Sequence, residues 1–156
     1  QFSFSERNTL LSSGISTLNI IGNNVCIERM ITTYKKNNSS VNDESYLNVE
    51  SIFTLSFIRS YFRNKFWGKF NRYKLADDAT KISAGQKIIT PKIAKAELIC
   101  IYKDLEEFGL VQNTDLFIKN LAVVRDKQNR SKLNMVLPPT IMSQLFNVDA
   151  VIQFRR

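Results

Sequence analysis

The chain has 156 residues and a mass of 18.0 kDa, which suits one domain with a hydrophobic core. Hydrophobic residues make up 44% and charged residues 23%, with only 5 Gly and 3 Pro, so collagen-like, low-complexity and wholly disordered chains are excluded. The net charge of +8 favours an acidic partner, such as nucleic acid, an anionic membrane or an acidic protein surface.

The sequence contains no histidine, the side chain most used for proton transfer near neutral pH and for binding transition metals. Ser-His-Asp, Cys-His and histidine-metal sites are therefore excluded. The acidic pairs Asp77-Asp78 and Glu106-Glu107 are chain neighbours, whose carboxylates do not converge on one bond, so we interpret them as turn or helix-surface residues. No glycine-rich phosphate loop is present. We expect no enzyme activity, no cofactor and no metal.

Cys26 and Cys100 each lie inside an apolar run, which favours two reduced core residues over a disulfide or a nucleophile. No apolar run approaches the ~18 to 20 residues of a membrane span, and the first residues lack the basic and then apolar order of a signal peptide. Because the chain begins with Gln1, we expect it to be a piece of a longer protein.

The first half of the chain predicts a helix, a hairpin and a loop. Ser5 can cap a short helix that ends at Gly14. Residues 15–20 and 25–31 are typical of strands, and the Gly-Asn-Asn sequence between them favours a tight turn. The polar stretch 35–44 has no periodicity, which indicates a surface loop.

A long helix is predicted to follow, capped by Ser45, with apolar residues on two different flanks. A lone surface helix has one apolar face, so we expect this helix to be sandwiched inside the domain or between subunits. Residues 72–85 lose the period and are predicted to form a loop. The two flanks consist of Val49, Phe53 and Phe57, and of Ile52, Leu55, Phe62 and Phe66.

The clearest amphipathic helix is predicted between Thr90-Pro91 and Gly109. Lys92 and Lys95 lie at the positive end of its dipole, where cations are unfavourable. This placement fits a partner surface, although ordinary solubilising lysines explain it equally well. The apolar stripe is Ala94, Leu98, Ile101, Leu105 and Phe108, and the polar face carries Lys92, Lys95, Ile99 and Lys103.

A short helix is predicted from Thr114, and residues 121–126 and 133–137 form a second hairpin that Pro138-Pro139 ends. Together these elements predict an α+β fold: an antiparallel or mixed sheet of hairpins packed with one long buried helix, one amphipathic helix and a free C-terminal strand.

That last strand is predicted because apolar and polar side chains alternate at the end of the chain. A strand with a free end can add to the sheet edge of another chain through main-chain hydrogen bonds, or it can pair within its own domain. The pattern leaves both alternatives open. The residues are Val148, Asp149, Ala150, Val151, Ile152, Gln153, Phe154 and Arg155.

The segment Arg59–Lys74 interleaves cations with aromatic rings, a composition typical of platforms that stack single-stranded nucleic acid. The alternative is a core helix, because Phe62 and Phe66 fall in helical register with Ile52 and Leu55. We favour the core helix and keep a basic nucleic-acid-binding module as the alternative function.

The sequence also resembles the C-terminal domain of the tail sheath proteins of contractile phage tails, in the Mu-like branch. The similarity runs in collinear order along essentially the whole chain. The matching stretches are Ser5-Glu6-Arg7-Asn8, Gly14-Ile15-Ser16-Thr17, the segment from Ile27 to Tyr34, the segment from Ser45 to Ser56, the segment from Arg72 to Asp78, Ile89-Thr90-Pro91-Lys92 and Leu137-Pro138-Pro139.

This resemblance implies a structural protein that stacks in rings around a tail tube and contracts to drive the tube through the host envelope. Residues 1–156 would be the inner-wall, tube-proximal domain, in the virion tail and, during assembly, in the host cytoplasm. The partners would be identical sheath subunits in hexameric-type rings and the tail tube protein, without nucleic acid or membrane insertion. Residues 148–155 would be the strand exchanged between subunits, and Lys92, Lys95, Ile99 and Lys103 would face the tube.

Overall fold

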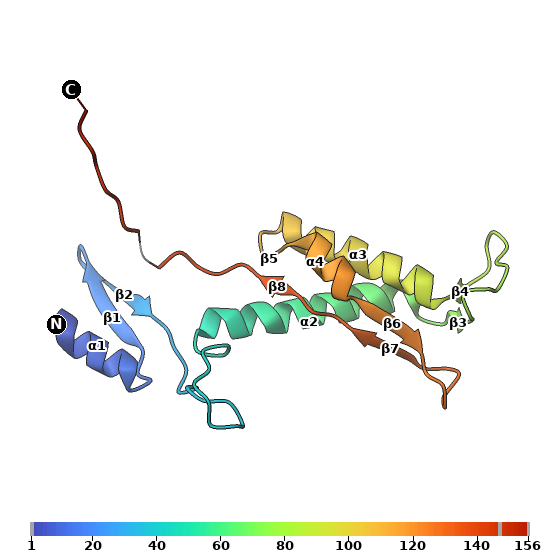
Figure 1. Cartoon of the computed structure of the whole chain (residues 1–156), viewed down its shortest axis with the longest axis horizontal. Coiled ribbons are helices and arrows are strands. Elements are labelled where there is room, and N and C mark those ends of the chain that lie inside the picture. Colours follow the sequence, from blue (N-terminus) through green and yellow to red (C-terminus); the bar gives the residue numbers. More distant parts are fainter. Residues whose placement is uncertain (1, 147, 156) are drawn as a thin grey trace. The chain divides into compact units, whose positions relative to one another are not determined.

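A computed structural model describes residues 2–146 and 148–155 (Figure 1). The chain forms two compact units: unit 1 is Gln1–Lys74 with Gly85–Lys87, and unit 2 is Leu75–Ala84 with Ile88–Arg156. Helices and two-stranded sheets alternate along the chain, which confirms the predicted α+β class. The strands form separate two-stranded sheets, paired β1-β2, β3-β4, β5-β8 and β6-β7. The assignment of all 156 residues to one domain stays a prediction.

Unit 1 begins with α1 (Phe4–Ser12). The predicted cap Ser5 is wrong, because the hydroxyl of Ser3 accepts from the backbone N–H of Glu6 while the Glu6 carboxylate accepts from the N–H of Ser3. This reciprocal capping box satisfies two backbone donors at once. Gly14 follows the helix at φ +81°, and an added Cβ would lie 3.2 Å from the Cα of Thr33, so the chain turns there only with glycine.

The predicted first hairpin is confirmed as β1 (Thr17–Ile21) and β2 (Asn24–Arg29), which pair antiparallel. Its base is closed by Ser16, whose hydroxyl accepts from the N–H of Ile31 and donates to the Ile31 carbonyl. The predicted loop at 35–44 is confirmed and consists mostly of exposed residues. At its base the Tyr34 hydroxyl donates to Asp43 over 2.6 Å, and this hydrogen bond raises the pKa of Tyr34 to about 12.

The long helix is α2 (Val49–Phe70), and the predicted Ser45 cap is wrong: Asn48 occupies the N-cap position, and its side chain makes no capping hydrogen bond. Ser45 instead bonds the Asp43 carboxylate through both its N–H and its hydroxyl. One flank of α2 is buried, at Ile58, Phe62 and Phe70. The stripe that contains Phe53 and Phe57 is exposed, so only one side of α2 is covered within the chain.

Short strands occur where the sequence predicts none. β3 (Lys74–Leu75) pairs with β4 (Ile88–Ile89), and β3 lies in the predicted loop at 72–85. β5 (Val111–Gln112) pairs with β8 (Thr140–Ile141). Strands of two residues carry too little alternation to be recognised from sequence. The acidic pair at 77–78 lies in a turn as expected, since the N–H of Thr80 donates to the carbonyl of Asp77. The two carboxylates contact more distant residues: Asp77 pairs with Arg125 over 2.8 Å, and Asp78 accepts from the N–H of Lys92.

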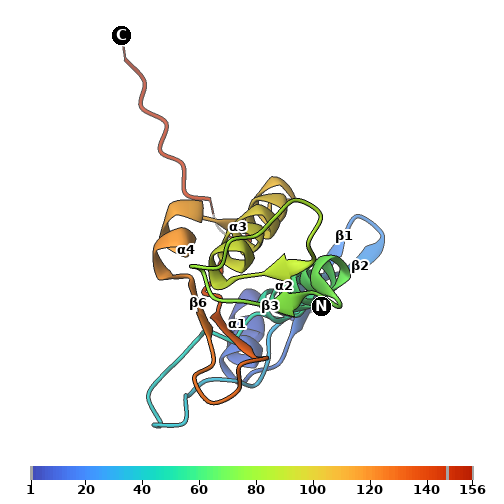
Figure 2. The same cartoon turned by 90° about the vertical axis from the view of Figure 1, so that its right-hand side faces the viewer.

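Unit 2 is built around α3 (Pro91–Glu107), where Thr90 caps the helix as predicted. α3 packs against α4 (Thr114–Asn120) and β6 (Ala122–Arg125), and β6 forms the predicted hairpin with β7 (Leu133–Val136) (Figure 2). The core consists of Ala94, Leu98, Ile101, Tyr102, Leu105, Val111, Phe117 and Leu121.

Two residues of α3 are not in the predicted core. Phe108 is exposed, because the helix ends at Glu107 and the chain turns at Gly109 with φ +69°. Cys100 is also exposed and Cys26 is only half-buried, and both are free thiols. Cys100 lies opposite the buried stripe, since residues 98 and 101 on either side of it face the core.

Tyr102 joins the helices of unit 2 to its last strand pair. Its ring stacks on Phe117 with the centroids 3.8 Å apart. Its hydroxyl donates to the carbonyl of Gln112 over 2.7 Å and accepts from the N–H of Thr140 over 3.2 Å. One fully buried side chain therefore holds β5 and β8 together.

We predict that Tyr102→Phe lowers the free energy of unfolding by about 1–3 kcal/mol, because it leaves two backbone groups without their partner. Urea titration monitored by circular dichroism measures this loss. Tyr46→Phe is the matched control, since the Tyr46 ring is half-exposed. Equal stability of the two variants would contradict the role given to the Tyr102 hydroxyl.

Candidate functional site

The predicted C-terminal strand lies in the segment 148–155, which is extended but belongs to no strand pair in the structure (Figure 1). All of its side chains are exposed, and Ile152 is 95% exposed. Among the described residues it has no ladder partner. In an extended chain, successive side chains point to opposite sides, so the segment still has two distinct sides. One side carries residues 148, 150, 152 and 154, and the other carries residues 149, 151, 153 and 155. It presents backbone donors and acceptors together with apolar side chains.

The β1–β2 hairpin exposes a second apolar surface. Its register places Leu18 opposite Ile27 and Ile20 opposite Val25, so these four side chains share one face. Each is more than half exposed. We call this surface the hairpin face (Leu18, Ile20, Val25 and Ile27). Exposing four aliphatic side chains on one small sheet to water is unfavourable. An apolar patch of this kind marks a site of protein contact.

The hairpin is also open at its edges. In the part of the chain that the structure describes, β1 and β2 form a sheet of two strands only. A two-stranded sheet is marginally stable in water, and three or more strands are needed for independent stability. The outer edge of each strand can accept a further strand through main-chain hydrogen bonds.

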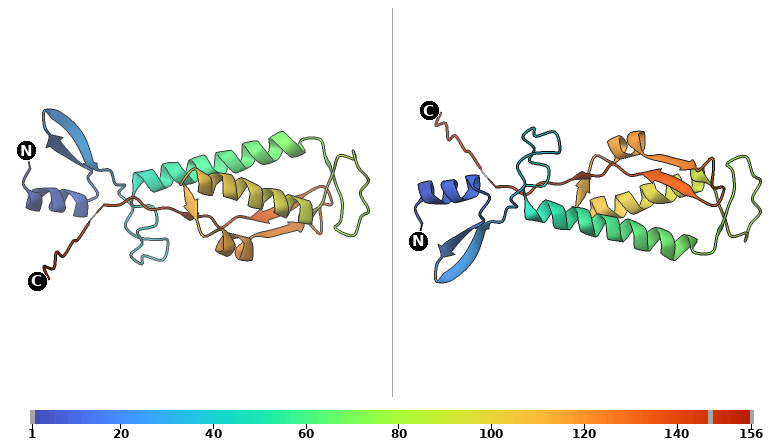
Figure 3. Two further views of the ribbon diagram at one scale, coloured as in Figure 1. Left: turned by 90° about the horizontal axis from the view of Figure 1, so that it is seen from above. Right: turned by 90° about the horizontal axis from the view of Figure 1, so that it is seen from below.

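α1 holds the hairpin from one side (Figure 3). The guanidinium of Arg7 pairs with Glu28 of β2 over 2.9 Å, and Arg7 also donates to the carbonyl of Phe2. Lys35 donates to the carbonyl of Ser12 at the end of α1. The helix therefore supports the hairpin at its base and leaves the hairpin face exposed.

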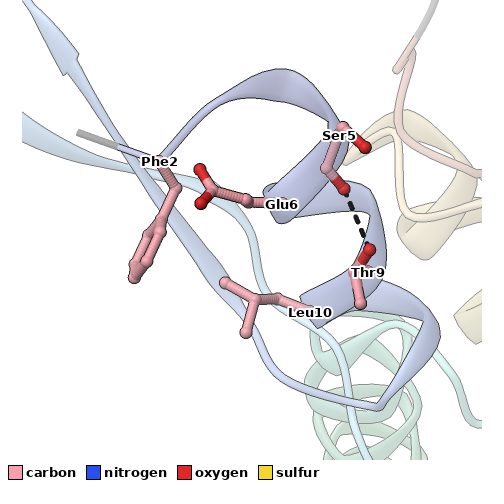
Figure 4. A pocket seen from close by; sticks show the side chains of 5 residues that line it. All are labelled: Phe2, Ser5, Glu6, Thr9 and Leu10. Carbon is pink, nitrogen blue, oxygen red and sulfur yellow. Dashed lines mark hydrogen bonds between the residues drawn. The ribbon is translucent and has the colours of Figure 1, made fainter.

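A shallow pocket on α1 lies between the side chains of Phe2 and Leu10, with Ser5, Glu6 and Thr9 completing its wall (Figure 4). Hydrogen bonds from the N–H and the hydroxyl of Ser3 keep the pKa of Glu6 below its ordinary value. The Thr9 hydroxyl donates to the carbonyl of Ser5 over 3.0 Å. The polar groups of the pocket serve the helix itself, so the pocket offers an apolar hollow and no reactive group.

The predicted polar face of α3 is present. Lys92 and Lys103 are exposed, while Lys95 and Ile99 are half-buried. No acidic residue lies in the first turn of α3, so the two lysines there oppose the helix dipole as the sequence indicates. Whether this face meets the tube stays a prediction.

The aromatic and basic segment Arg59–Lys74 is divided between core and surface. Phe62 and Phe70 are buried and Phe66 is half-buried. The rings of Phe66 and Phe70 pack on each other, as do those of Phe70 and Tyr73. These rings hold the helix in place, so they are not available to stack on nucleotide bases.

The described residues contain no cluster of acidic or cysteine side chains that could hold a metal ion. None of the helices described at 2–146 is long and apolar enough to cross a membrane. What the structure does present are two surfaces suited to protein contacts: an open hairpin and an exposed alternating segment.

Two comparisons with known proteins identify the family of the chain. Residues 41–155 match the phage tail sheath C-terminal domain family. The chain belongs to this tail sheath family. It is also 43% identical over 150 residues, 96% of its length, to the Mu-like prophage FluMu tail sheath protein of Haemophilus influenzae. The predicted Mu-like tail sheath resemblance is thereby confirmed.

This tail sheath chain spans 31% of the length of the Haemophilus relative. The tail sheath family is structural.

Sequence reasoning identified the C-terminal segment of this tail sheath domain but did not identify the hairpin as a possible acceptor. The sequence contained part of the information needed to identify the hairpin as an acceptor. Two strand-like runs around a Gly-Asn-Asn turn predicted the hairpin, but a strand of an antiparallel sheet usually buries one face against a core. Only the structure shows that the hairpin face stays exposed and that no third strand joins it among the described residues.

We predict that the backbone amides of 148–155 exchange with solvent at nearly unprotected rates in the isolated chain, because they form no ladder. Amides in the middle of α3 should be protected by at least about a thousandfold more, since their exchange requires opening of the core. Hydrogen–deuterium exchange with mass spectrometry measures both. Strong protection of 148–155 in dilute chain would show pairing within its own fold.

Proposed function

We propose that this chain is the inner-wall domain of a contractile tail sheath subunit, which polymerises around the tail tube and contracts to drive the tube through the host envelope. The observation that carries the proposal is the combination, in a tail sheath family member, of an open β-hairpin and an exposed alternating segment at opposite ends of the sequence. The partners are identical sheath subunits in rings and the tail tube protein, in the virion tail and, before that, in the host cytoplasm.

Strand exchange would link the subunits. The segment 148–155 of one copy adds to the edge of the β1–β2 hairpin of a neighbour and extends the sheet. Each main-chain hydrogen bond contributes roughly 0.5–1.5 kcal/mol net, so half a dozen of them contribute several kcal/mol. The side chains of 148, 150, 152 and 154 then join the hairpin face, which adds burial of aliphatic surface.

Such a link suits contraction, because backbone pairing holds the copies together while the domains move as rigid bodies. Tyr102 has a part in this, since it fixes β8 to the core just before the exchanged segment. A pull on the segment is then passed to the whole of unit 2.

The tube contact is proposed for the polar face of α3, with Lys92, Lys95, Ile99 and Lys103. Basic side chains would meet an acidic tube surface, and contacts between exposed charges are weakened by salt. Weak contacts of this kind can be released when the sheath contracts, whereas the exchanged strands persist.

Ile152→Pro in the full-length protein tests the exchanged strand. Proline removes one N–H and disfavours the ladder, so we predict at least about tenfold less sheath polymer by electron microscopy. Ile152→Val, which keeps the N–H and β-branching, should assemble normally. Residue 152 is almost fully exposed, so folding of either variant is not impaired. Polymer of normal yield and length from the proline variant would refute strand exchange through this segment.

Lys92→Glu combined with Lys103→Glu tests the tube face. Both lysines are exposed. An acid at position 92 suits the helix N-terminus, but Asp78 already accepts from the N–H of residue 92, so circular dichroism of the variant checks that the fold is kept. We predict that tube-templated assembly falls by about tenfold at ~0.05 M salt and by about twofold at ~0.5 M salt. Lys81→Glu combined with Lys127→Glu, both on exposed loops, is the control with the same change in net charge. Unchanged assembly would remove the tube contact from α3.

A further inference from the structure

One face of α2 exposes aromatic side chains that the fold leaves uncovered. Phe53, Phe57 and Trp67 are 70%, 49% and 60% exposed. At 3.6 residues per turn these positions fall within about 80° of arc, on the side away from Ile58 and Phe62. We call them the α2 aromatic face. Phe53 and Phe57 lie one turn apart and form a pair of exposed rings. Trp67 lies about 15 Å further along the same side, beyond the polar residues Ser60 and Asn64. Exposed aromatic side chains of this size mark a protein contact.

Cations border this face on both sides. Arg63 precedes Trp67 by one turn, and Lys65 places its ammonium 5.2 Å from the centre of the Tyr61 ring, which itself stacks on Phe57. The sequence from 59 to 74 contains six cations and no acid. Two copies that met through this same face would bring like charges together. A partner with an acidic border is favoured instead.

The same chain carries a surface of that chemistry, where α3 ends and α4 begins in unit 2. From 104 to 118 there are four acids and no cation. The exposed side chains of Phe108 and Leu116 lie among them, and the Thr114 hydroxyl donates to Glu106 over 2.7 Å, joining the two helix ends. We call this surface the acidic corner. Its charged residues are Asp104, Glu106, Glu107 and Asp115.

Two of these acids lie at the end of α3 where the helix dipole disfavours negative charge. The last turn of α3 contains Glu106 and Glu107 and no basic residue, although carboxylates are disfavoured at the negative end of a helix dipole. A cationic partner at this end would offset the unfavourable placement. The basic border of the α2 aromatic face provides such cations.

We propose that the α2 aromatic face of one copy binds the acidic corner of a second copy. The two surfaces differ, so the contact is heterologous and repeats from copy to copy, as rings and helical assemblies require. This inference rests on the proposed function, which makes identical copies neighbours. It adds a side-chain contact that is separate from the exchange of 148–155.

Cross-linking tests which surfaces meet. In chain with Cys26→Ser and Cys100→Ser, one population carries Phe57→Cys and the other Leu116→Cys. A short bis-maleimide should give at least about fivefold more dimer in the mixture than in either population alone. Lys81→Cys mixed with Leu116→Cys is the control for random collision. Equal dimer in the Phe57→Cys population alone, or none in the mixture, would overturn the proposal.

Charge reversal gives a second measurement in the full-length protein. Arg63→Glu and Glu107→Arg should each lower sheath polymer by about tenfold, and the double variant should recover to within about twofold of the unmodified protein. If neither reversal matters while Ile152→Pro abolishes polymer, the α2 contact is wrong and strand exchange stands. If Ile152→Pro also assembles normally, the proposed function itself fails, and the cross-linking result alone decides the α2 contact.

Discussion

Unpaired backbone at a sheet edge is the constraint on which this molecule depends. The β1–β2 hairpin has two strands and an apolar face that the rest of the chain leaves open to water. A sheet of this size cannot satisfy its own edges or cover its own face. Natural proteins usually protect such edges with charge, proline or a covering element. Here α1 supports the hairpin through Arg7 and Glu28 and leaves the edges open.

The two units differ in how much of their apolar surface is buried. Unit 2 has a packed core in which Tyr102 stacks on Phe117 and bonds the backbone on both sides of the β5–β8 pair. Unit 1 keeps much of its apolar surface exposed, on the hairpin and on α2. A subunit with a packed core and exposed apolar surfaces can bury those surfaces against neighbouring subunits. The proposed assembly uses both the hairpin and α2 in this way.

Several elements were predictable because their local chemistry is strong. The Thr90-Pro91 start of α3, its apolar stripe and the two hairpins follow from caps, periodicity and turn residues. The errors have local causes as well. Ser5 and Ser45 are good caps by residue type, but the Ser3 hydroxyl caps α1, and α2 begins after Asn48 without a side-chain cap. Residue type alone therefore did not locate the start of either helix. Cys100 and Phe108 were expected in the core, yet Cys100 lies on the side of α3 opposite the buried stripe and Phe108 lies beyond the helix end.

By itself the sequence determined the α+β class, the order of the main elements, the absence of histidine chemistry and the alternating C-terminal segment, since each depends on residue type and spacing within one stretch of chain. It also carried the tail sheath resemblance. Only the tertiary structure decided which apolar surfaces stay exposed: the hairpin face, one side of α2 and the segment 148–155. Alternation and helical period tell which side chains share a face, but whether a face is covered depends on contacts between residues far apart in the chain.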